Sequence, residues 1–313
     1  MGIRLALFTL ILISSAISSA QGLSCSYLLK GQEERYLDLL KKVEYRQIQK
    51  LKVPYIDINS KSKKTVVLVA GFSKSMLTWA EQVERLVSQG YRVISMENFN
   101  IGLNLKKNGL VKLKSNEGIN FDAVILSELI KRLKPKGSLR MVGHSRGAAV
   151  AAVATEALVR QGRTVKSLQL MSPYVEYIWE TSSMPSSSLS WIINTYPNLV
   201  GISLDQGVKQ SAADDVIALD NSERRRGYAY VLKGLQPYLG DSYKLSESLN
   251  FLSLESRVKI QVFGVQNDGD FSPVDKIVEL ASDGVEVFVF DDEAKTHYWP
   301  LEESALVNSL IIQ

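Results

Sequence analysis

The stretch of sequence that decides the fold reads Leu139-Arg140-Met141-Val142-Gly143-His144-Ser145-Arg146-Gly147-Ala148-Ala149-Val150. Residues 139–142 are typical of a short buried strand, and the alanine-rich segment 148–161 is typical of a helix that packs closely on a sheet. Between them, residues 143–147 match the pattern G-x-S-x-G. On a tight strand-to-helix turn the two glycines avoid steric clashes, and the helix N-terminus faces the serine hydroxyl. The pattern predicts a nucleophilic Ser145; the alternative is a glycine-rich turn whose serine only caps the helix.

Outward from this turn, strand patterns alternate with helix patterns along the chain. Expected strands lie at 55–58, 65–69, 91–96, 139–142, 165–171, 258–263 and 285–290, and expected helices at 26–51, 76–88, 121–133, 148–161 and 274–281. This alternation predicts an α/β fold, a mostly parallel, doubly wound sheet with helices on both faces. More than eighty residues separate the strands ending at 171 and starting at 258, which is too long for a bare loop. We expect an inserted helical cap at about 174–255.

Composition excludes several classes of protein. The chain has 313 residues, of which 45% are hydrophobic and 22% charged, so disorder, collagen and a coiled coil are excluded. A formal charge of +4 is too small to indicate a nucleic-acid partner by itself. One cysteine and two histidines cannot build a four-ligand zinc site without several carboxylates. With no phosphate loop or dinucleotide fingerprint either, the sequence predicts neither a cofactor nor a metal.

The amino terminus has the pattern of an export signal. In residues 1–20 an early Arg4 precedes an apolar run and small residues that end at Ala20, which predicts a secretory signal peptide. The protein is then periplasmic or secreted, and no later apolar segment reaches the roughly 18 residues that a membrane span needs. Cys25 follows closely: the favoured interpretation is an inert thiol, and the alternative is acylation that tethers a lipoprotein, although Gly22 stands where such sites usually carry an aliphatic residue.

With these elements in place, the chain resembles the α/β-hydrolase family from about residue 55 to its end. The resemblance rests on the G-x-S-x-G turn of residues 143–147, on the order of the elements and on their spacing. It implies one hydrolase domain at 55–313, carrying the cap and preceded by a helical segment at 21–54. In that family the catalytic residues follow the chain order nucleophile, acid, histidine.

The catalytic partners of Ser145 are assigned partly by elimination. His144 is its chain neighbour, and adjacent side chains on a strained turn do not point at one another, so His144 packs beneath the turn or lines the pocket. His297, after the last strand, remains as the base that takes the serine proton. The resemblance places the acid on the loop after the strand 258–263. There Asp268 is preferred to Asp270, because it lies nearer the strand and a turn glycine follows it.

The resemblance also implies an oxyanion hole and a class of reaction. One backbone donor is the amide of Arg146, and the other is the amide of Phe72, on the loop after the strand 65–69. Many relatives carry histidine where this chain has Ala70. The expected function is hydrolysis of a small-molecule or lipid-like carboxylic ester through an acyl-serine intermediate. The alternatives are an exported peptidase or amidase, and a catalytically inactive binding module of the cell envelope.

Overall fold

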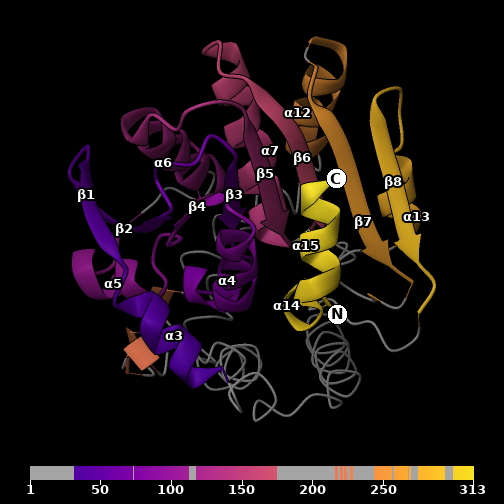
Figure 1. Cartoon of the computed structure of the whole chain (residues 1–313). Helices are drawn as coiled ribbons and strands as arrows, with labels where there is room; N and C mark the ends of the chain where they lie inside the picture. The colour runs from indigo at the N-terminus through magenta and orange to yellow at the C-terminus, as the bar shows by residue number, and fades with distance from the viewer. Residues whose placement is uncertain are drawn as a thin grey trace, which may run out of the picture.

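A computed structural model of the chain shows one sheet covered by helices on both faces (Figure 1). The structure describes residues 32–72, 74–112, 118–174, 216–217, 219–220, 222–223, 226–227, 243–255, 257–266, 268, 274–292 and 299–313. The expected signal peptide at 1–20 and Cys25 lie outside these residues. No helix within the described ranges is long and apolar enough to span a membrane.

The sheet has eight strands in the order β1-β2-β4-β3-β5-β6-β7-β8. The first two strands pair antiparallel, as do β2 and β4, and every pair from β4 to β8 is parallel. The expected mostly parallel sheet is therefore confirmed. The strand bounds are β1 Glu44–Ile48, β2 Leu51–Ile58, β3 Thr65–Val69, β4 Arg92–Met96, β5 Leu139–His144, β6 Val165–Met171, β7 Lys259–Val265 and β8 Val285–Phe290.

Helices cover the two faces of the sheet in two groups, which confirms the doubly wound arrangement. One face carries α3 (Glu33–Leu40), the 3-10 turn η1 (Met76–Trp79), α4 (Ala80–Ser88) and α15 (Ser304–Ile312). The other carries α6 (Gly118–Leu133), α7 (Arg146–Arg160), α12 (Tyr243–Glu255) and α13 (Val274–Glu279). Two short helices, α5 (Gly102–Asn108) and α14 (Trp299–Glu302), lie in connections.

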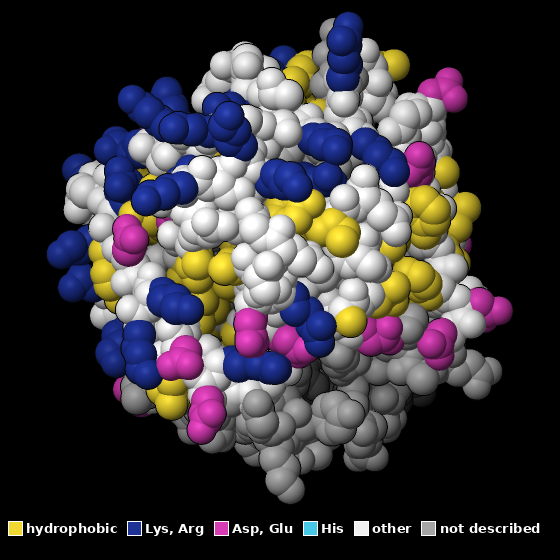
Figure 2. Space-filling view, in the orientation of Figure 1, with side chains coloured by type: hydrophobic (Ala, Val, Ile, Leu, Met, Phe, Trp, Pro, Cys, Tyr) yellow, Lys and Arg dark blue, Asp and Glu magenta, His cyan; other side chains and the backbone are white. Residues whose placement is uncertain are grey.

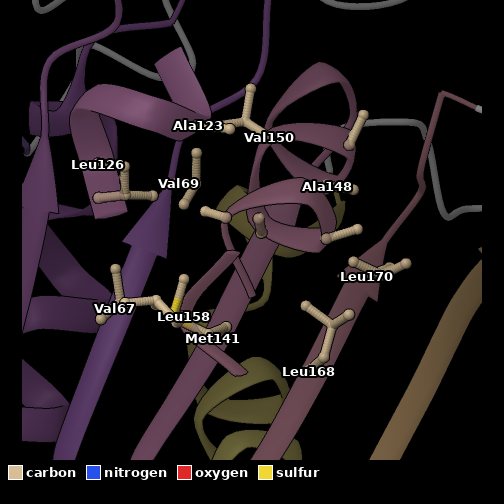
Figure 3. Packing of buried hydrophobic residues seen from close by; sticks show 14 of the residues in the cluster. Val67, Val69, Ala123, Leu126, Met141, Ala148, Val150, Leu158, Leu168 and Leu170 are labelled. Atoms are coloured by element: carbon tan, nitrogen blue, oxygen red, sulfur yellow. The ribbon is translucent and has the colours of Figure 1, made fainter. Parts of the chain in front are cut away.

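The central strand β3 shows why the sheet is buried on both sides. All five of its residues are buried, and successive side chains enter opposite cores. Val67 and Val69 pack with α6 and α7, as Figure 3 shows, whereas Val66 and Leu68 pack with α4 and α15. A continuous run of β-branched and aliphatic residues is therefore required here, because neither face meets water.

The structure corrects two expected boundaries. The helix expected at 26–51 ends at Leu40, and β1 begins at Glu44, so residues 44–54 join the sheet and the domain begins before residue 55. The expected end of the cap at residue 255 is also too late. Leu245, Leu249 and Leu252 of α12 are buried in the core beside α7, so this helix belongs to the sheet domain. The rest of the expected cap lies almost entirely outside the described residues.

Candidate active site

Ser145 occupies a strained turn between β5 and α7. Its backbone angles are φ 53° and ψ −125°, a conformation that costs a non-glycine residue about 1–3 kcal/mol. Two hydrogen bonds hold the turn: the Ser145 amide donates to the Met171 carbonyl at 3.0 Å, and the Ala148 amide donates to the Ser145 carbonyl at 2.9 Å. Strain of this kind persists only where the surrounding structure imposes it. The position is the one in which the sequence pattern predicts a nucleophile.

The two glycines of the pattern are required by close backbone approach. A Cβ atom added to Gly143 would lie 2.3 Å from the Gly147 carbonyl oxygen, and one added to Gly147 would lie 2.4 Å from the Ala70 carbonyl oxygen. Both distances are too short for any side chain, and both neighbours are backbone atoms that cannot move aside. The turn is thus packed directly against the loop that follows β3.

That loop is the expected second wall of an oxyanion hole. A Cβ on Gly71 would lie 3.2 Å from Ser145 Cβ, so its backbone passes directly beside the candidate nucleophile. Phe72, the expected donor, is partly buried against the core. Arg146, the other expected donor, is the first residue of α7, where backbone amides point along the positive end of the helix dipole. Arg146 is therefore the chain neighbour of Ser145, and Phe72 directly follows the glycine that passes beside it.

Two buried polar residues after β4 anchor the same loop. Asn98, which is fully buried, donates from Nδ2 to the Ala70 carbonyl at 2.9 Å. Glu97, also fully buried, accepts at Oε2 from the Ser75 hydroxyl at 2.8 Å and from the Met76 amide at 3.1 Å. Our sequence reasoning missed both residues. Their position directly after a buried strand, at the edge where the nucleophile lies, is the signal that points to them.

A buried ion pair ties the helix that follows Ser145 to its neighbour α6. Arg146 Nη2 lies 2.5 Å from Asp122 Oδ2, and both side chains are 1% exposed. Asp122 Oδ1 also accepts from the Phe99 amide at 3.0 Å. Burial raises the pKa of the Asp122 carboxyl, because its desolvation outweighs the attraction of Arg146 and the hydrogen bond from Phe99. The pair thus fixes the start of α7 against α6, although burying the Asp122 carboxylate is itself unfavourable.

The expected acid lies at the same edge of the sheet. Asp268 is 5% exposed and comes three residues after β7 ends, with its amide donating to the Val265 carbonyl at 3.2 Å. Since β6 separates β5 from β7, the two strands are about 10 Å apart. Asp268 and Ser145 therefore follow two strands of the sheet that β6 separates. Asp270, the less favoured acid, lies outside the described residues.

The expected base, His297, also lies outside the described residues, but Trp299, two residues further along the chain, is described. Trp299 is fully buried, and its Nε1 donates to Ser172 Oγ at 3.1 Å. Ser172 directly follows Met171, whose carbonyl accepts from the Ser145 amide. Two residues after the expected base, the chain is therefore fixed at the end of β6, the strand whose last residue binds the Ser145 amide.

The second histidine, His144, packs beneath the turn. It is 1% exposed, and the ring of Trp79 meets it edge to face at a centroid distance of 6.5 Å. This is the first of the two roles that the sequence left open for it. Within the described ranges, no group of three or more His, Cys, Asp or Glu side chains is placed to hold a metal ion.

Comparison with solved structures shows the same fold in an esterase, a carboxylesterase and a probable hydrolytic enzyme. An esterase from Exiguobacterium antarcticum superposes with a TM-score of 0.62 at 16% identity, over 86% of this chain and 97% of that one. A carboxylesterase structure from the ammonia-oxidizing thaumarchaeon Nitrososphaera gargenis gives a TM-score of 0.60 at 14% identity, over 86% and 96% of the two chains. A probable hydrolytic enzyme from Pseudomonas aeruginosa gives 0.61 at 16% identity, over 86% and 92%.

Sequence comparison identifies the family. No curated protein matches the chain. The family model described as serine aminopeptidase, S33, matches residues 60–230, which include the β3 loop and the turn of Ser145. That match covers more than half of the sequence and agrees with the mostly parallel eight-stranded sheet. The chain therefore belongs to the serine aminopeptidase (S33) family of α/β-hydrolases, a family of hydrolytic enzymes.

Proposed function

We propose that the protein is an exported serine hydrolase that cleaves carboxylic esters through an acyl-serine intermediate. The observation that carries the proposal is the strained Ser145, with φ 53°, packed against the Gly71 backbone at the N-terminus of α7. A serine held in this way offers its hydroxyl beside two backbone amides, those of Phe72 and Arg146. Export rests on the predicted signal peptide at 1–20, and the acylated Cys25 remains the alternative to a freely soluble form.

In the proposed acylation step, His297 removes the hydroxyl proton of Ser145 while the serine oxygen attacks the acyl carbon. Asp268 orients the imidazole and stabilises its protonated form. The oxyanion accepts hydrogen bonds from the Phe72 and Arg146 amides, each contributing roughly 100-fold or more to the rate. When the tetrahedral intermediate collapses, the ester C–O bond breaks and the alcohol leaves with the proton from His297.

In the proposed deacylation step, a water molecule attacks the acyl-serine. His297 removes a proton from that water, and a second tetrahedral intermediate forms at the same oxyanion position. Its collapse breaks the bond to Ser145 Oγ, which regains its proton from His297, and the carboxylic acid leaves. No cofactor takes part in either step.

The choice of an ester over an amide rests on the relatives, since the same triad can serve both. The solved structures of the same fold from Exiguobacterium and Nitrososphaera are an esterase and a carboxylesterase, which favours the ester. The matching family model is described as serine aminopeptidase, which favours an exported peptidase as the second candidate.

A fluorophosphonate probe tests the nucleophile. The full-length protein should be labelled at Ser145; Ser145→Ala should abolish labelling, and His297→Ala should reduce it at least roughly 1,000-fold. His144→Ala, in the only other histidine, is the matched control for an imidazole that lies beneath the turn. A folded protein that takes no label would overturn the enzyme in favour of the inactive binding module.

Substrate class and the acid are tested by turnover. Comparing 4-nitrophenyl esters with aminoacyl 4-nitroanilides distinguishes the esterase from the peptidase, and faster turnover of the anilides would replace the first proposal by the second. For the acid, Asp268→Asn should lower kcat by orders of magnitude while the matched Asp270→Asn leaves it within a few fold. The reverse result would move the role to Asp270.

A further inference from the structure

The edge of the sheet opposite Ser145 carries a concentration of cations. In a parallel sheet the loops that enter neighbouring strands share one edge, and β3, β5, β6 and β7 are consecutive neighbours. The segments that enter these strands, residues 59–64, 134–138, 161–166 and 257–259, contain nine Lys or Arg and neither Asp nor Glu. We call them the basic edge; its cations are Lys61, Lys63, Lys64, Lys134, Lys136, Arg163, Lys166, Arg257 and Lys259.

Direct contacts hold three of these segments side by side. A Cβ on Gly137 would lie 2.5 Å from the Lys63 carbonyl oxygen, so the first two segments touch through their backbones. The Arg163 guanidinium donates to the carbonyl oxygens of Pro135 and Gly137, which joins the third segment to the second. The cations therefore project from one fixed surface about 14 Å wide, the width of four parallel strands.

These cations are available to a partner. All except Arg163 are exposed. Lys259 lies 3.6 Å from Glu286, in a pair in which both side chains are about half exposed, and the other eight form no ion pair with any described residue. Since the whole chain carries +4, the sequence outside the nine cations carries a net −5. The nine cations of the basic edge therefore exceed the net charge of the whole chain.

The molecular surface shows an uneven distribution of charge. Figure 2 shows Lys and Arg gathered over the upper half of the molecule, where the amino ends of β5, β6 and β7 lie in Figure 1, and most Asp and Glu lie lower. The carboxyl ends of helices attract some cations, such as Arg160 in the last turn of α7. That attraction does not account for nine cations in loops and strand starts without one acid among them.

We infer that the basic edge is a docking surface for an anionic phospholipid membrane. Lysine supplies seven of the nine cations, and its hydrated point charge suits attraction to many phosphate groups rather than a bidentate match to one. Each cation close to an anionic membrane strengthens adsorption about fivefold. A protein docked in this way holds Ser145, at the far ends of the same strands, away from the lipid.

A nucleic acid is the other polyanion that such a surface fits, and the composition argues against it. The four segments contain no Phe, Tyr or Trp for stacking on bases. The guanidinium of Arg163 is engaged with backbone carbonyls, so it is not available for bidentate contact with a base. The absence of aromatic residues also means that docking is electrostatic, without insertion into the lipid.

The test is sedimentation with vesicles of phosphatidylglycerol and phosphatidylcholine, using the full chain with Cys25→Ser so that acylation contributes nothing. The protein should bind these vesicles and not vesicles of phosphatidylcholine alone. Binding should fall steeply as NaCl rises from about 0.05 to about 0.3 M, because the Debye length shortens. The triple variant Lys63→Glu, Lys136→Glu and Lys166→Glu should bind at least about 100-fold more weakly.

The matched control changes the same charge elsewhere. Lys50, Lys52 and Lys107 are exposed. The first two lie at the start of β2, which runs antiparallel to β4 and so begins at the opposite edge, and the third lies on α5, which follows the end of β4. Their triple change to Glu should lower binding much less. Equal losses in both triple variants, no binding of anionic vesicles, or tighter binding to duplex DNA than to vesicles would each overturn the inference. Thermal melting of all variants shows whether the fold is kept.

Discussion

Arg146 and Asp122 form a buried ion pair, and removing the aspartate should lower the stability of the fold more than removing the arginine. Both side chains are 1% exposed, and the guanidinium Nε and Nη1 have no hydrogen-bond partner among the described residues. An arginine cannot lose its charge when its counter-ion is removed, whereas a buried carboxyl can take up a proton. Burial already raises the pKa of Asp122 in the presence of Arg146. Loss of the aspartate should therefore be the more damaging change.

The expected magnitudes follow from this asymmetry. Asp122→Asn leaves a buried charge without a counter-ion, which should lower the free energy of unfolding by about 3–5 kcal/mol. Arg146→Met leaves a carboxyl that can protonate, and should cost about 1–3 kcal/mol. The double variant keeps an acceptor for the Phe99 amide, and neither of its two new side chains is charged. It should be close in stability to Arg146→Met alone, with a coupling energy of about 2 kcal/mol or more.

Urea unfolding followed by circular dichroism measures these values. Arg146→Met should also show a pH dependence: a carboxyl whose native pKa is raised contributes most below its unfolded value of about 3.9, and that contribution is lost as pH rises through the native pKa. The stability of Arg146→Met should thus fall on going from acid to neutral pH, relative to the double variant. A cost below about 1 kcal/mol for Asp122→Asn, or additive costs in the double variant, would refute the argument.

Three further outcomes follow from contacts around the site and the helices. Gly147→Ala would bring a Cβ atom to 2.4 Å from a backbone carbonyl oxygen and should abolish fluorophosphonate labelling. Gly162 has φ +77° but nothing within 4 Å of an added Cβ atom. Gly162→Ala should therefore keep the labelling and lower the free energy of unfolding in urea by only about 1–2 kcal/mol. Asn98→Ala frees the loop beside Ser145 and should lower kcat about 10- to 100-fold with KM nearly unchanged, measured on a soluble 4-nitrophenyl ester. Burial alone would raise the pKa of Glu81, but hydrogen bonds from Ser304 and Arg85 and the charges of Arg35 and Arg85 lower it overall. The contribution of Glu81 to the free energy of unfolding is therefore present above about pH 4.3 and is lost as the pH falls through the native pKa. Glu81→Gln should thus make the free energy of unfolding, measured by urea at several pH values, fall less steeply on the acid side.

Short sequence patterns predict the strands whose residues must be apolar because both faces of the sheet are buried. The bounds of β3, β6 and β8 match the expected strands, because runs of apolar residues between polar turns leave little choice of structure. The turn of Ser145 is equally local, since its two glycines and its small helical residues are all within a few positions. These features require no information about distant segments of the chain.

The remaining features depend on contacts between distant segments. The strand β1 reads as part of a helix, because its charged residues carry no clear alternation and its conformation is fixed by pairing with β2 across a turn in which Gln49 has φ 52°. Asp122 and Arg146 are 24 positions apart, and Asn98 and Ala70 are 28. A sequence pattern that spans one helix or strand cannot show such pairs.

The direction of the parallel strands connects the two ends of this molecule. The parallel strands β3, β5 and β7 are each followed by a helix (α4, α7 and α13) that leads back to the start of the next strand, so these helices begin at the edge of Ser145 and end at the basic edge. The first arrangement favours the negative charge that develops on an oxyanion, and the second favours lysine over glutamate. Exposed helix-terminal charges contribute only about 0.3–1 kcal/mol each. Three charge reversals at the basic edge should therefore weaken membrane docking far more than they weaken the fold, which makes docking separable from stability by experiment.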